Sequence, residues 1–335
     1  MNRLNISILP AGAWGTALAI PLSDNAHTVK LYFRQKMDAD DFNRTKQNLK
    51  RLPKIKFNGL VFGTHNLEEA VAGADILVLA CDAAHVRYFF TTIKPILKKE
   101  TKILSVSKGI EEDTSLCMSE VLEEIEPGIS SRLAVLSGPN FAIEVGRRSP
   151  SMTVVASYNK NVAEFLQRIL SSENFRVYTQ DDVLGVQFGG ALKNVIAIGV
   201  GIGDGLGCGE NGRAALITRG VAEMIKLGTA LGAHKSTFAG LSGIGDLILT
   251  CTSGQSRNHK AGLKIGRGEN PKNLLDSHET IEGLHTTKAV IEIVKKKHLR
   301  LPLMEMVYKI VYKGLKPKEE FKKLMKLELS NEDGF

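Results

Sequence analysis

Short apolar runs rich in β-branched residues alternate with helix-like segments through the first half of this chain. The runs typical of strands are Asn5–Leu9, Thr28–Phe33, Ala74–Ala80, Thr101–Ser107, Leu133–Leu136 and Met152–Ala156. Helical patterns lie between several of them, at Thr16–Asn25, Leu67–Ala72 and Val86–Leu97. This alternation is the sequence signature of βαβ units, whose crossover helices enforce a parallel sheet. We therefore predict an N-terminal, Rossmann-like α/β domain with a doubly wound parallel sheet.

The strand pattern stops near Asp181, and longer helical patterns follow. They cover Gly185–Gly199, Arg213–Leu231, Lys288–Lys297 and Pro302–Lys313. A chain of 335 residues suits two domains at about 150 residues each. We predict a boundary near Leu184, with domains at 1–184 and 185–335. The glycine-rich stretch Gly199–Gly212 favours a loop over a phosphate cradle, because no Lys-Ser/Thr pair follows it.

The charge balance points to an anionic partner without naming it. Lys and Arg number 44 against 36 Asp and Glu, a net charge of +8. Several cations lie in stretches typical of solvated helix surface, such as 295–297 and 313–326. Aromatic residues are only 6% and do not interleave with the basic runs, so the stacking platforms of single-strand binders are missing. We expect no nucleic-acid partner.

The cysteines favour a reducing compartment. Cys81, Cys117, Cys208 and Cys251 form no close pair, which argues against a zinc cluster, a redox dithiol or a disulfide framework. His278 and His285 lack helical ligand spacing, and we expect no metal site. No apolar run reaches the length of a membrane helix, so we expect a cytoplasmic protein without membrane insertion.

The first strand runs into a turn that resembles a dinucleotide-binding motif. In "LPAGAWGTALA", which starts at Leu9, Gly12 and Gly15 occupy the second and third glycine positions of G-x-G-x-x-G. The amides of Ala13 and Trp14 would then face a pyrophosphate at a helix N-terminus. The first glycine is replaced by Pro10, so an ordinary strand-to-helix turn is an equally good interpretation of these residues alone.

Arg34 follows the second strand, where an acidic residue would bind the ribose 2′-hydroxyl of NAD. A guanidinium at that place can instead pair with the 2′-phosphate of NADP. The alternative is an ordinary surface arginine. We expect NADP or NAD as cofactor, with NADPH preferred.

Six further motifs occur in one order along the chain. They are "SVSKGIE" from Ser105, "LSGPNFAIEV" from Leu136, "GGALKNVIAI" from Gly189, "GRAALITRG" from Gly212, "GLSGIGDLILTCTSGQSRN" from Gly240 and "TIEGLHTTKAV" from Thr280. Together they resemble the bacterial NAD(P)-dependent glycerol-3-phosphate dehydrogenases. The resemblance covers about Ile6 to Glu328. It implies an enzyme that interconverts dihydroxyacetone phosphate and sn-glycerol 3-phosphate for glycerophospholipid synthesis, as a cytoplasmic homodimer.

The same resemblance implies roles for individual residues. Lys193 would be the catalytic acid/base, Lys108 would contact nicotinamide and substrate, and Asp246 would complete the proton-transfer site. The implied substrate-binding set is Lys108, Gly138, Asn140, Lys193, Asp246, Ser256, Arg257 and Asn258. The implied cofactor-binding set is Gly12, Ala13, Trp14, Gly15, Arg34, Lys108, Ala142, Arg257 and Glu282.

These residue types suit the reaction. Hydride addition to a ketone places negative charge on its oxygen, and a nearby ammonium stabilises that charge and delivers a proton. Burial or the charge of Lys108 would lower the pKa of Lys193, whereas Asp246 would raise it. Arg257 and Asn258 offer a guanidinium fork and an amide to phosphate oxygens.

Two residues depart from the family pattern on the cofactor side. Pro10 replaces a glycine, and Asp82 stands where the family usually has proline after the fourth strand. Two alternatives stay open, and the departures motivate the second of them. One is a related two-domain dehydrogenase acting on another hydroxy acid or phosphorylated sugar acid. The other is a non-catalytic dinucleotide-sensing protein, although such a protein would not need the proton donor at Lys193.

Overall fold

The structure is a computed structural model that describes residues 2–276 and 280–326. The chain divides into two compact units. Among the described residues, unit 1 comprises 2–107 and 118–183, and unit 2 comprises 108–117 and 184–326. The segment 108–117 therefore leaves unit 1 after a strand, packs with unit 2 and returns. Each unit is described separately.

Unit 1 is built on one eight-stranded sheet with the strand order β3-β2-β1-β4-β5-β6-β7-β8. The strands are β1 (Asn5–Leu9), β2 (Thr28–Tyr32), β3 (Val61–Thr64), β4 (Ile76–Leu79), β5 (Lys102–Ser105), β6 (Leu133–Ser137), β7 (Ser151–Ala156) and β8 (Phe175–Gln180). The first six are parallel in the 3-2-1-4-5-6 order of a Rossmann fold. The described sheet therefore confirms the predicted doubly wound fold. Only the β6–β7 pairing is antiparallel, so β7 and β8, which are parallel to each other, run opposite to the first six strands.

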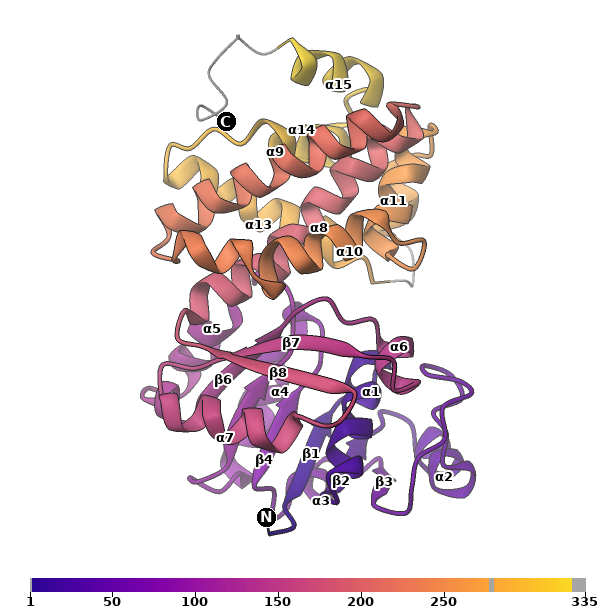
Figure 1. Cartoon of the computed structure of the whole chain (residues 1–335), viewed down its shortest axis with the longest axis vertical. Coiled ribbons are helices and arrows are strands. Elements are labelled where there is room, and N and C mark those ends of the chain that lie inside the picture. The colour runs from indigo at the N-terminus through magenta and orange to yellow at the C-terminus, as the bar shows by residue number, and fades with distance from the viewer. Residues whose placement is uncertain (1, 277–279, 327–335) are drawn as a thin grey trace. The chain divides into compact units, whose positions relative to one another are not determined.

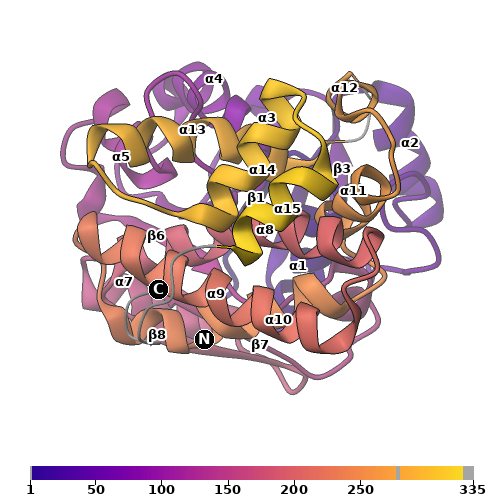
Figure 2. The ribbon, with the colours of Figure 1, turned by 90° about the horizontal axis from the view of Figure 1, so that it is seen from above.

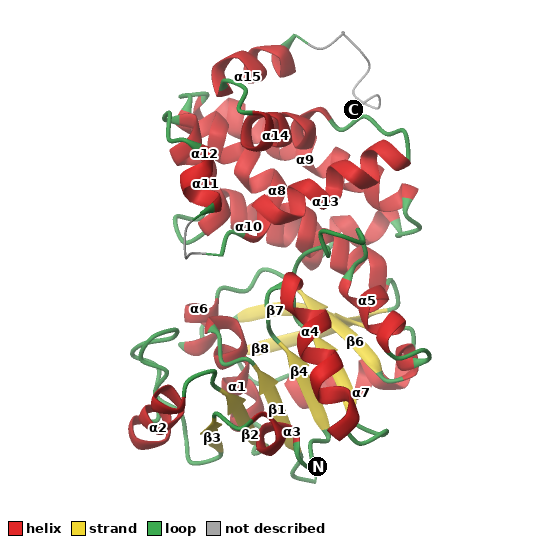
Figure 3. Cartoon of the chain, turned by 180° about the vertical axis from the view of Figure 1, so that it is seen from behind, coloured by secondary structure: helices red, strands yellow, loops and turns green. Residues whose placement is uncertain are grey.

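Helices cover both faces of this sheet, as the doubly wound pattern requires. The helices of unit 1 are α1 (Ala13–Asp24), α2 (Lys36–Thr45), α3 (Leu67–Val71), α4 (Ala83–Ile93), α5 (Met118–Ile125), α6 (Ala142–Gly146) and α7 (Lys160–Leu170), with short 3₁₀ turns η1 (Lys94–Ile96) and η2 (Ile129–Ser131). Helices α1, α6 and α7 pack together on one face, shown in Figure 1, and α3, α4 and α5 on the other, shown in Figure 3. The central strands β1, β4, β5 and β6 are largely buried between them, and β4 is buried throughout.

The six predicted strands are all present, and two more were not predicted. Strand β3 has four residues and contains Gly63, so its apolar signal is short and interrupted. Strand β8 alternates buried and exposed residues, a pattern that a search for continuous apolar runs does not detect. Both strands lie at the edges of the sheet, where burial on both faces is not required.

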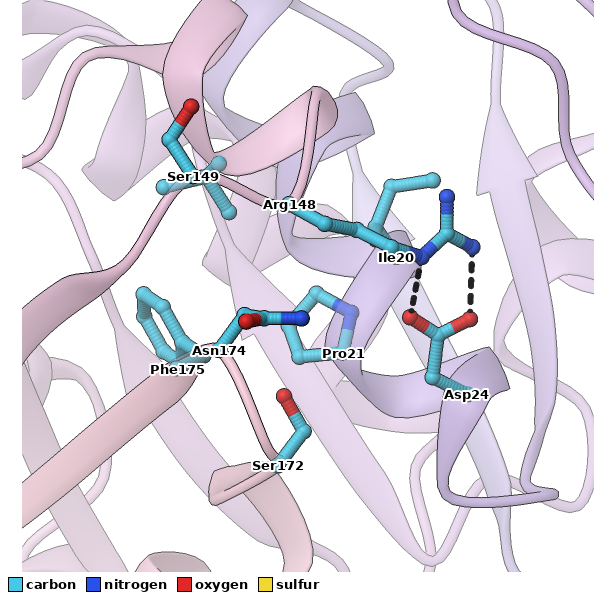
Figure 4. A pocket seen from close by; sticks show the side chains of 9 residues that line it. Ile20, Pro21, Asp24, Arg148, Ser149, Ser172, Asn174 and Phe175 are labelled. Carbon is cyan, nitrogen blue, oxygen red and sulfur yellow. Dashed lines mark hydrogen bonds and ion pairs between the residues drawn. The ribbon is translucent and has the colours of Figure 1, made fainter.

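A partly exposed ion pair lies at the C-terminal end of α1. Arg148, in the turn after α6, donates from Nε and Nη2 to the two carboxylate oxygens of Asp24, at 2.8 and 2.7 Å. Figure 4 shows this bidentate pair at the edge of a hollow of about 10 Å³, beside Pro21 and Phe175. A hollow of this size holds about one water molecule. The pair therefore fixes the position of α6 against α1, and its Asp24 carboxylate raises the pKa of Arg148.

Unit 2 is helical throughout its described part. Its helices are α8 (Val183–Gly205, whose first residue belongs to unit 1), α9 (Gly209–Ala230), α10 (Asp246–Thr252), α11 (Arg257–Gly266), α12 (Pro271–Leu275), α13 (Glu282–Lys296), α14 (Pro302–Lys313) and α15 (Pro317–Met325), with shorter turns η3 (Lys235–Ala239) and η4 (Leu241–Gly245). Helix α8 runs between α9, α11 and α13 (Figures 1 and 2). It is long and apolar enough to cross a membrane, but 94% of its most apolar window is buried inside the structure, as in the core helix of a soluble protein.

The prediction of a loop at Gly199–Gly212 is wrong. Helix α8 continues to Gly205, α9 begins at Gly209, and only a short turn separates them. The glycines serve helix packing instead. A Cβ added at Gly205 would lie 2.8 Å from Cα of Gly266, and one added at Gly201 would overlap the carbonyl oxygen of His259. Glycine spacing along α8 thus lets α11 approach its backbone closely, which a loop interpretation misses.

Candidate active site

Helix α8 carries Lys193 in the interior of unit 2. The residues around it are apolar and small, and Lys193 is only 8% exposed. One turn earlier, a Cβ at Gly189 would overlap the carbonyl oxygen of Ser242 in η4. The glycine therefore permits close contact between α8 and η4, and this contact brings Lys193 to the start of α10.

Two residues one turn apart on α10 receive the Lys193 ammonium. Nζ of Lys193 donates to Oδ1 of Asp246 at 2.6 Å and to Oγ1 of Thr250 at 2.9 Å. Asp246 and Thr250 are 1% and 3% exposed, and their i, i+4 spacing puts them on one face of the helix. An ammonium has three N–H donors. Two are used by these residues, so the third is available to an oxygen atom of a bound molecule.

Lys108 provides a second cation to the same carboxylate. Its Nζ donates to Oδ2 of Asp246 at 2.7 Å. Lys108 begins the 108–117 segment, which an antiparallel bridge between Ile110 and Cys117 closes on itself. Lys288 of α13 donates to Glu112 in this segment. The carboxylate of Asp246 therefore lies between two ammonium groups and orients both.

Burial dominates the protonation of Lys193. It lowers the pKa of Lys193 to about 8, and the positive charge of Lys108 lowers it further, while the carboxylate of Asp246 opposes the shift. Sequence reasoning left this balance open, and the structure decides it in favour of burial. A lysine with a pKa near neutrality can hold or release a proton under ordinary conditions, as acid/base catalysis needs.

A chain of amide hydrogen bonds follows directly after Lys193. Asn194 donates to Oε2 of Glu282 at 3.1 Å and accepts from Nδ2 of Asn258 at 2.9 Å. Oδ1 of Asn258 in turn accepts the backbone N–H of Gly283 at 2.9 Å. Asn258 thus uses its oxygen and one of its two amide donors inside unit 2. The chain connects α8, α11 and α13, which carry three of the predicted site motifs.

One buried and one exposed polar side chain lie at the start of α11. Ser256 is buried and caps the helix, because its Oγ accepts the N–H of His259 at 3.1 Å. Arg257 is the first residue of the helix and is exposed. An exposed guanidinium beside a helix N-terminus favours an anion, since the helix dipole adds to its charge.

Comparison with known proteins covers nearly the whole chain. The profile described as NAD-dependent glycerol-3-phosphate dehydrogenase N-terminus matches residues 5–163, and the corresponding C-terminus profile matches residues 182–322. The chain belongs to the NAD-dependent glycerol-3-phosphate dehydrogenase family.

Individual members of the family are similar along their full lengths. A glycerol-3-phosphate dehydrogenase [NAD(P)+] of Moorella thermoacetica is 44% identical over 92% of both chains. One of Symbiobacterium thermophilum is 42% identical over 96% of this chain and 94% of its own. The crystal structure of the Coxiella burnetii glycerol-3-phosphate dehydrogenase superposes with a TM-score of 0.90 at 34% identity, over 97% of this chain and 99% of that one. These comparisons favour the predicted dehydrogenase over both alternatives.

In unit 1, the turn after β1 leaves the first backbone amides of α1 unpaired. No side chain caps α1 at Gly12, and the amides of Ala13, Trp14 and Gly15 have no hydrogen-bond partner among the described residues. A Cβ at Gly15 would lie 2.7 Å from the carbonyl oxygen of Pro10, so this close turn needs its glycine. Unpaired amides at a helix N-terminus fit a pyrophosphate group.

Two charges of opposite sign flank Cys81 near this turn. The pKa of the Cys81 thiol is raised to about 12, chiefly by burial; Asp82 raises it further and Arg34 opposes the shift. Arg34 and Asp82 therefore act in one electrostatic neighbourhood. Arg34 is exposed and lies over the Phe89 ring, with 5.9 Å from its guanidinium carbon to the ring centroid.

The "SGPNFA" residues also lie in unit 1. Nδ2 of Asn140 donates to the carbonyl of Met152 at 3.0 Å, while its buried Oδ1 has no hydrogen-bond partner among the described residues. A Cβ at Gly138 would lie 2.8 Å from Oγ1 of Thr153. Ala142 begins α6. An unsatisfied buried oxygen of this kind can receive a donor from a bound molecule.

Sequence reasoning did not single out Thr250 or Asn194. Thr250 was detectable by its i, i+4 spacing from Asp246, and Asn194 by its place beside Lys193 in "ALKN". Among residues 2–276 and 280–326, no group of three His, Cys, Asp or Glu residues could hold a metal ion. His278, considered above, lies outside the described residues.

Proposed function

We propose that this chain interconverts dihydroxyacetone phosphate and sn-glycerol 3-phosphate by hydride transfer with NADPH or NADH. The observation that carries the proposal is the buried cluster in which Lys193 and Lys108 share the Asp246 carboxylate. Membership of the glycerol-3-phosphate dehydrogenase family supports the choice of substrate. In the cell the product would supply the backbone of glycerophospholipids.

In this proposal Lys193 is the acid/base. In the reducing direction its free N–H points a proton at the ketone oxygen, which gains negative charge as hydride arrives at carbon. Lys193 then becomes a neutral amine in a buried site, and its pKa of about 8 makes that loss accessible. In the oxidising direction the amine takes the proton of the hydroxyl group. The bound nicotinamide supplies or accepts the hydride.

Asp246, Thr250 and Lys108 have supporting roles. Asp246 and Thr250 fix the direction of two Lys193 N–H bonds, so that the third has one orientation. Lys108 would contact substrate and nicotinamide, and its charge stabilises the developing oxyanion. The charge of Glu282 also acts on Lys193, so two carboxylates balance the two ammonium groups.

The substrate phosphate would be held at the start of α11. Arg257 offers a guanidinium fork, Ser256 its hydroxyl group, and Asn258 its remaining amide donor. Gly138 and Asn140 of unit 1 complete the proposed substrate-binding set. The amide chain from Asn258 to Asn194 and Glu282 supports this proposal, because it ties the phosphate-binding helix to the residue next to Lys193.

The cofactor would bind at the α1 turn. Gly12, Ala13, Trp14 and Gly15 would hold the pyrophosphate, and Arg34 would pair with a 2′-phosphate, favouring NADPH. Ala142, Arg257, Lys108 and Glu282 complete the proposed set. Assignment of cofactor binding to residues 1–184 and of catalysis and substrate binding to 185–335 remains a prediction.

We further propose a cytoplasmic homodimer. None of the four cysteines forms a disulfide in the described part of the chain, which suits a reducing compartment. Met152 and Tyr178 are exposed on the neighbouring strands β7 and β8, and such apolar surface near a sheet edge suits a partner subunit. Size-exclusion chromatography with light scattering tests the dimer, because a single species at 36.5 kDa would exclude it.

The test of function is a spectrophotometric assay at 340 nm. Purified protein is mixed with dihydroxyacetone phosphate and either NADPH or NADH, and loss of the reduced cofactor is followed. Oxidation that requires dihydroxyacetone phosphate and fails with unphosphorylated dihydroxyacetone at the same concentration is the expected result. Equal rates with both ketones, or with a hydroxy-acid precursor, would favour the related dehydrogenase instead.

A further inference from the structure

A cavity in unit 2 lies at the C-terminal end of α8, away from Lys193 on the same helix. It has a volume of about 610 Å³ and is lined where α8 ends, where α11 ends and by one face of α15. Gly205 and Gly266 are among the lining residues, and Leu206 and Phe321 provide apolar surface. The close contact of the two glycines leaves bare backbone there. Cys208 and three cationic side chains, Arg267, Lys318 and Lys322, complete the lining.

The three cations differ from their neighbours in having no acidic partner. On α15, Lys316 pairs with Glu319 and Lys323 pairs with Glu320. Lys318 and Lys322 lie one turn apart on the same helix. Neither they nor Arg267 form an ion pair or side-chain hydrogen bond with any residue in 2–276 or 280–326. The helix thus pairs its cations outside the cavity and leaves them unpaired inside it.

All three cations are exposed, so solvent screens their mutual repulsion, and the cluster attracts an anion without requiring one. Like charges at i, i+4 spacing repel each other, and Arg267 adds a third positive charge from another helix. A guanidinium fork with two ammonium groups matches the several oxygens of a phosphate or pyrophosphate group. Cavities that bind organic ligands have volumes of about 300–1,000 Å³, so there is room for more than an inorganic ion.

We propose that this cavity binds a phosphate-bearing organic anion of about nucleotide size. Its phosphate groups lie on Arg267, Lys318 and Lys322, and its apolar or ring portion packs on Phe321 and Leu206. The Phe321 ring packs against α8, with its Cε2 3.3 Å from the position of a Cβ at Gly203. The site is separate from the proposed substrate and cofactor sites and does not depend on them.

A competing explanation is that the cations only stabilise the ends of α8 and α11. The last carbonyl groups of a helix attract positive charge, and both helices end at this cavity. That explanation predicts a loss of thermal stability when the lysines are replaced and no saturable ligand binding. The two ideas therefore give different results in one experiment.

The experiment is calorimetric titration of the full chain with ADP, pyrophosphate and adenosine without added dinucleotide, because NADP⁺ carries the same phosphate groups and would compete for the cavity. ADP bound at the α1 turn is common to all variants and cancels when they are compared. Binding of ADP and pyrophosphate but not adenosine is expected. Lys318→Gln/Lys322→Gln should weaken ADP binding about tenfold or more, because two charge-assisted contacts are lost. Lys316→Gln/Lys323→Gln removes the same charge from the same helix and should change the dissociation constant less than about twofold.

Three results would overturn the proposal. One is the absence of saturable binding by wild type, and another is equal weakening in both double variants. The third concerns the carboxylates Glu328, Glu332 and Asp333, which follow α15 in the sequence. If ADP binds only after Glu328→Gln/Glu332→Gln/Asp333→Asn substitution in the full chain, the acidic end of the chain supplies the anion and no separate ligand is needed.

Discussion

The ammonium of Lys193 lies 2.6 Å from Oδ1 of Asp246, and Oδ2 of the same carboxylate lies 2.7 Å from the ammonium of Lys108. Asp246 is 1% exposed, so this carboxylate has almost no contact with water and is neutralised by two lysines. Lys193 nevertheless has a pKa lowered to about 8, because its own burial outweighs the attraction of the carboxylate.

That pKa predicts opposite pH dependences for the two directions of the reaction. Reduction needs protonated Lys193, so its rate should fall as pH rises through about 8. Oxidation needs the neutral amine, so its rate should rise through the same pH. Steady-state kcat/KM measured from pH 6 to 10 in both directions checks this. Parallel profiles would remove Lys193 from proton transfer.

Lys193→Ala should lower kcat by about 10²–10⁴-fold, because the lost group acts mainly on the transition state. The dissociation constant of the cofactor should change little, since the unit-1 turn is untouched. Stopped-flow turnover and fluorescence titration of NADPH measure the two quantities. Lys260→Ala removes an exposed lysine of α11 and should leave both unchanged. A Lys193 variant that keeps most of its kcat would show that the proton donor is another group.

Arg257→Ala should raise KM for dihydroxyacetone phosphate far more than it changes the use of unphosphorylated dihydroxyacetone. A lost charge-assisted contact costs about 1.5–3 kcal/mol, which is roughly 10- to 100-fold in KM. Lys260→Ala, on the same helix, is the matched control and should have no such selectivity. Equal losses on both ketones would instead assign Arg257 to the cofactor or to folding.

The sequence predicted the order of elements well because burial leaves a clear pattern. Strands such as β4 are buried on both faces and appear as continuous apolar runs. The edge strands β3 and β8 lack that signal. The stretch 199–212 was misinterpreted for a different reason: glycine favours loops by its backbone freedom, but here it is selected by close contact between α8 and α11. Only the partner helix reveals that requirement.

For the site, the sequence motifs predicted the residue types but not the pKa of Lys193 or the contacts between the helices. The motif containing Lys193 was recognisable, whereas its pKa depends on burial by residues distant in the chain. The contacts of Asn194 with Glu282 and Asn258 join residues 88 and 64 positions apart. No local pattern encodes such pairings, because they depend on how α8, α11 and α13 pack.

A buried carboxylate away from this site should make stability depend on pH. Glu223 is 1% exposed and accepts the backbone N–H groups of Leu303 and Met304 at the start of α14. Burial raises its pKa to about 7 from 4.5. The folded protein therefore holds a proton that the unfolded chain has released, so Glu223 costs stability as pH rises from 4.5 to 7. By linkage the total is about 3 kcal/mol.

Urea unfolding of wild type and Glu223→Gln at pH 5, 6, 7 and 8 measures this effect. The stability of wild type relative to the variant should decrease as pH rises. Glu292→Gln provides a control with no pH dependence over this range, because Lys295 lowers the pKa of Glu292 below 4.5 and the group stays ionised from pH 5 to 8. A wild type that gains stability relative to Glu223→Gln over this range would mean that the α14 amides outweigh burial.

Arg34 and Asp82 should have separable effects on cofactor binding. Arg34→Ala should weaken NADPH about 10- to 100-fold and leave NADH nearly unchanged, because the guanidinium pairs only with the 2′-phosphate. Asp82→Asn should tighten the binding of both dinucleotides. Asp82 directly precedes α4 and acts on Cys81 together with Arg34, and its carboxylate would repel the phosphate groups that both cofactors share. Lys36→Ala, an exposed cation two residues from Arg34, controls for general loss of charge. Fluorescence titration of wild type and of each variant, once with NADPH and once with NADH, measures the dissociation constants. If Arg34→Ala weakens both cofactors equally, Arg34 contacts the shared part of the dinucleotide, and the NADPH preference must come from another residue.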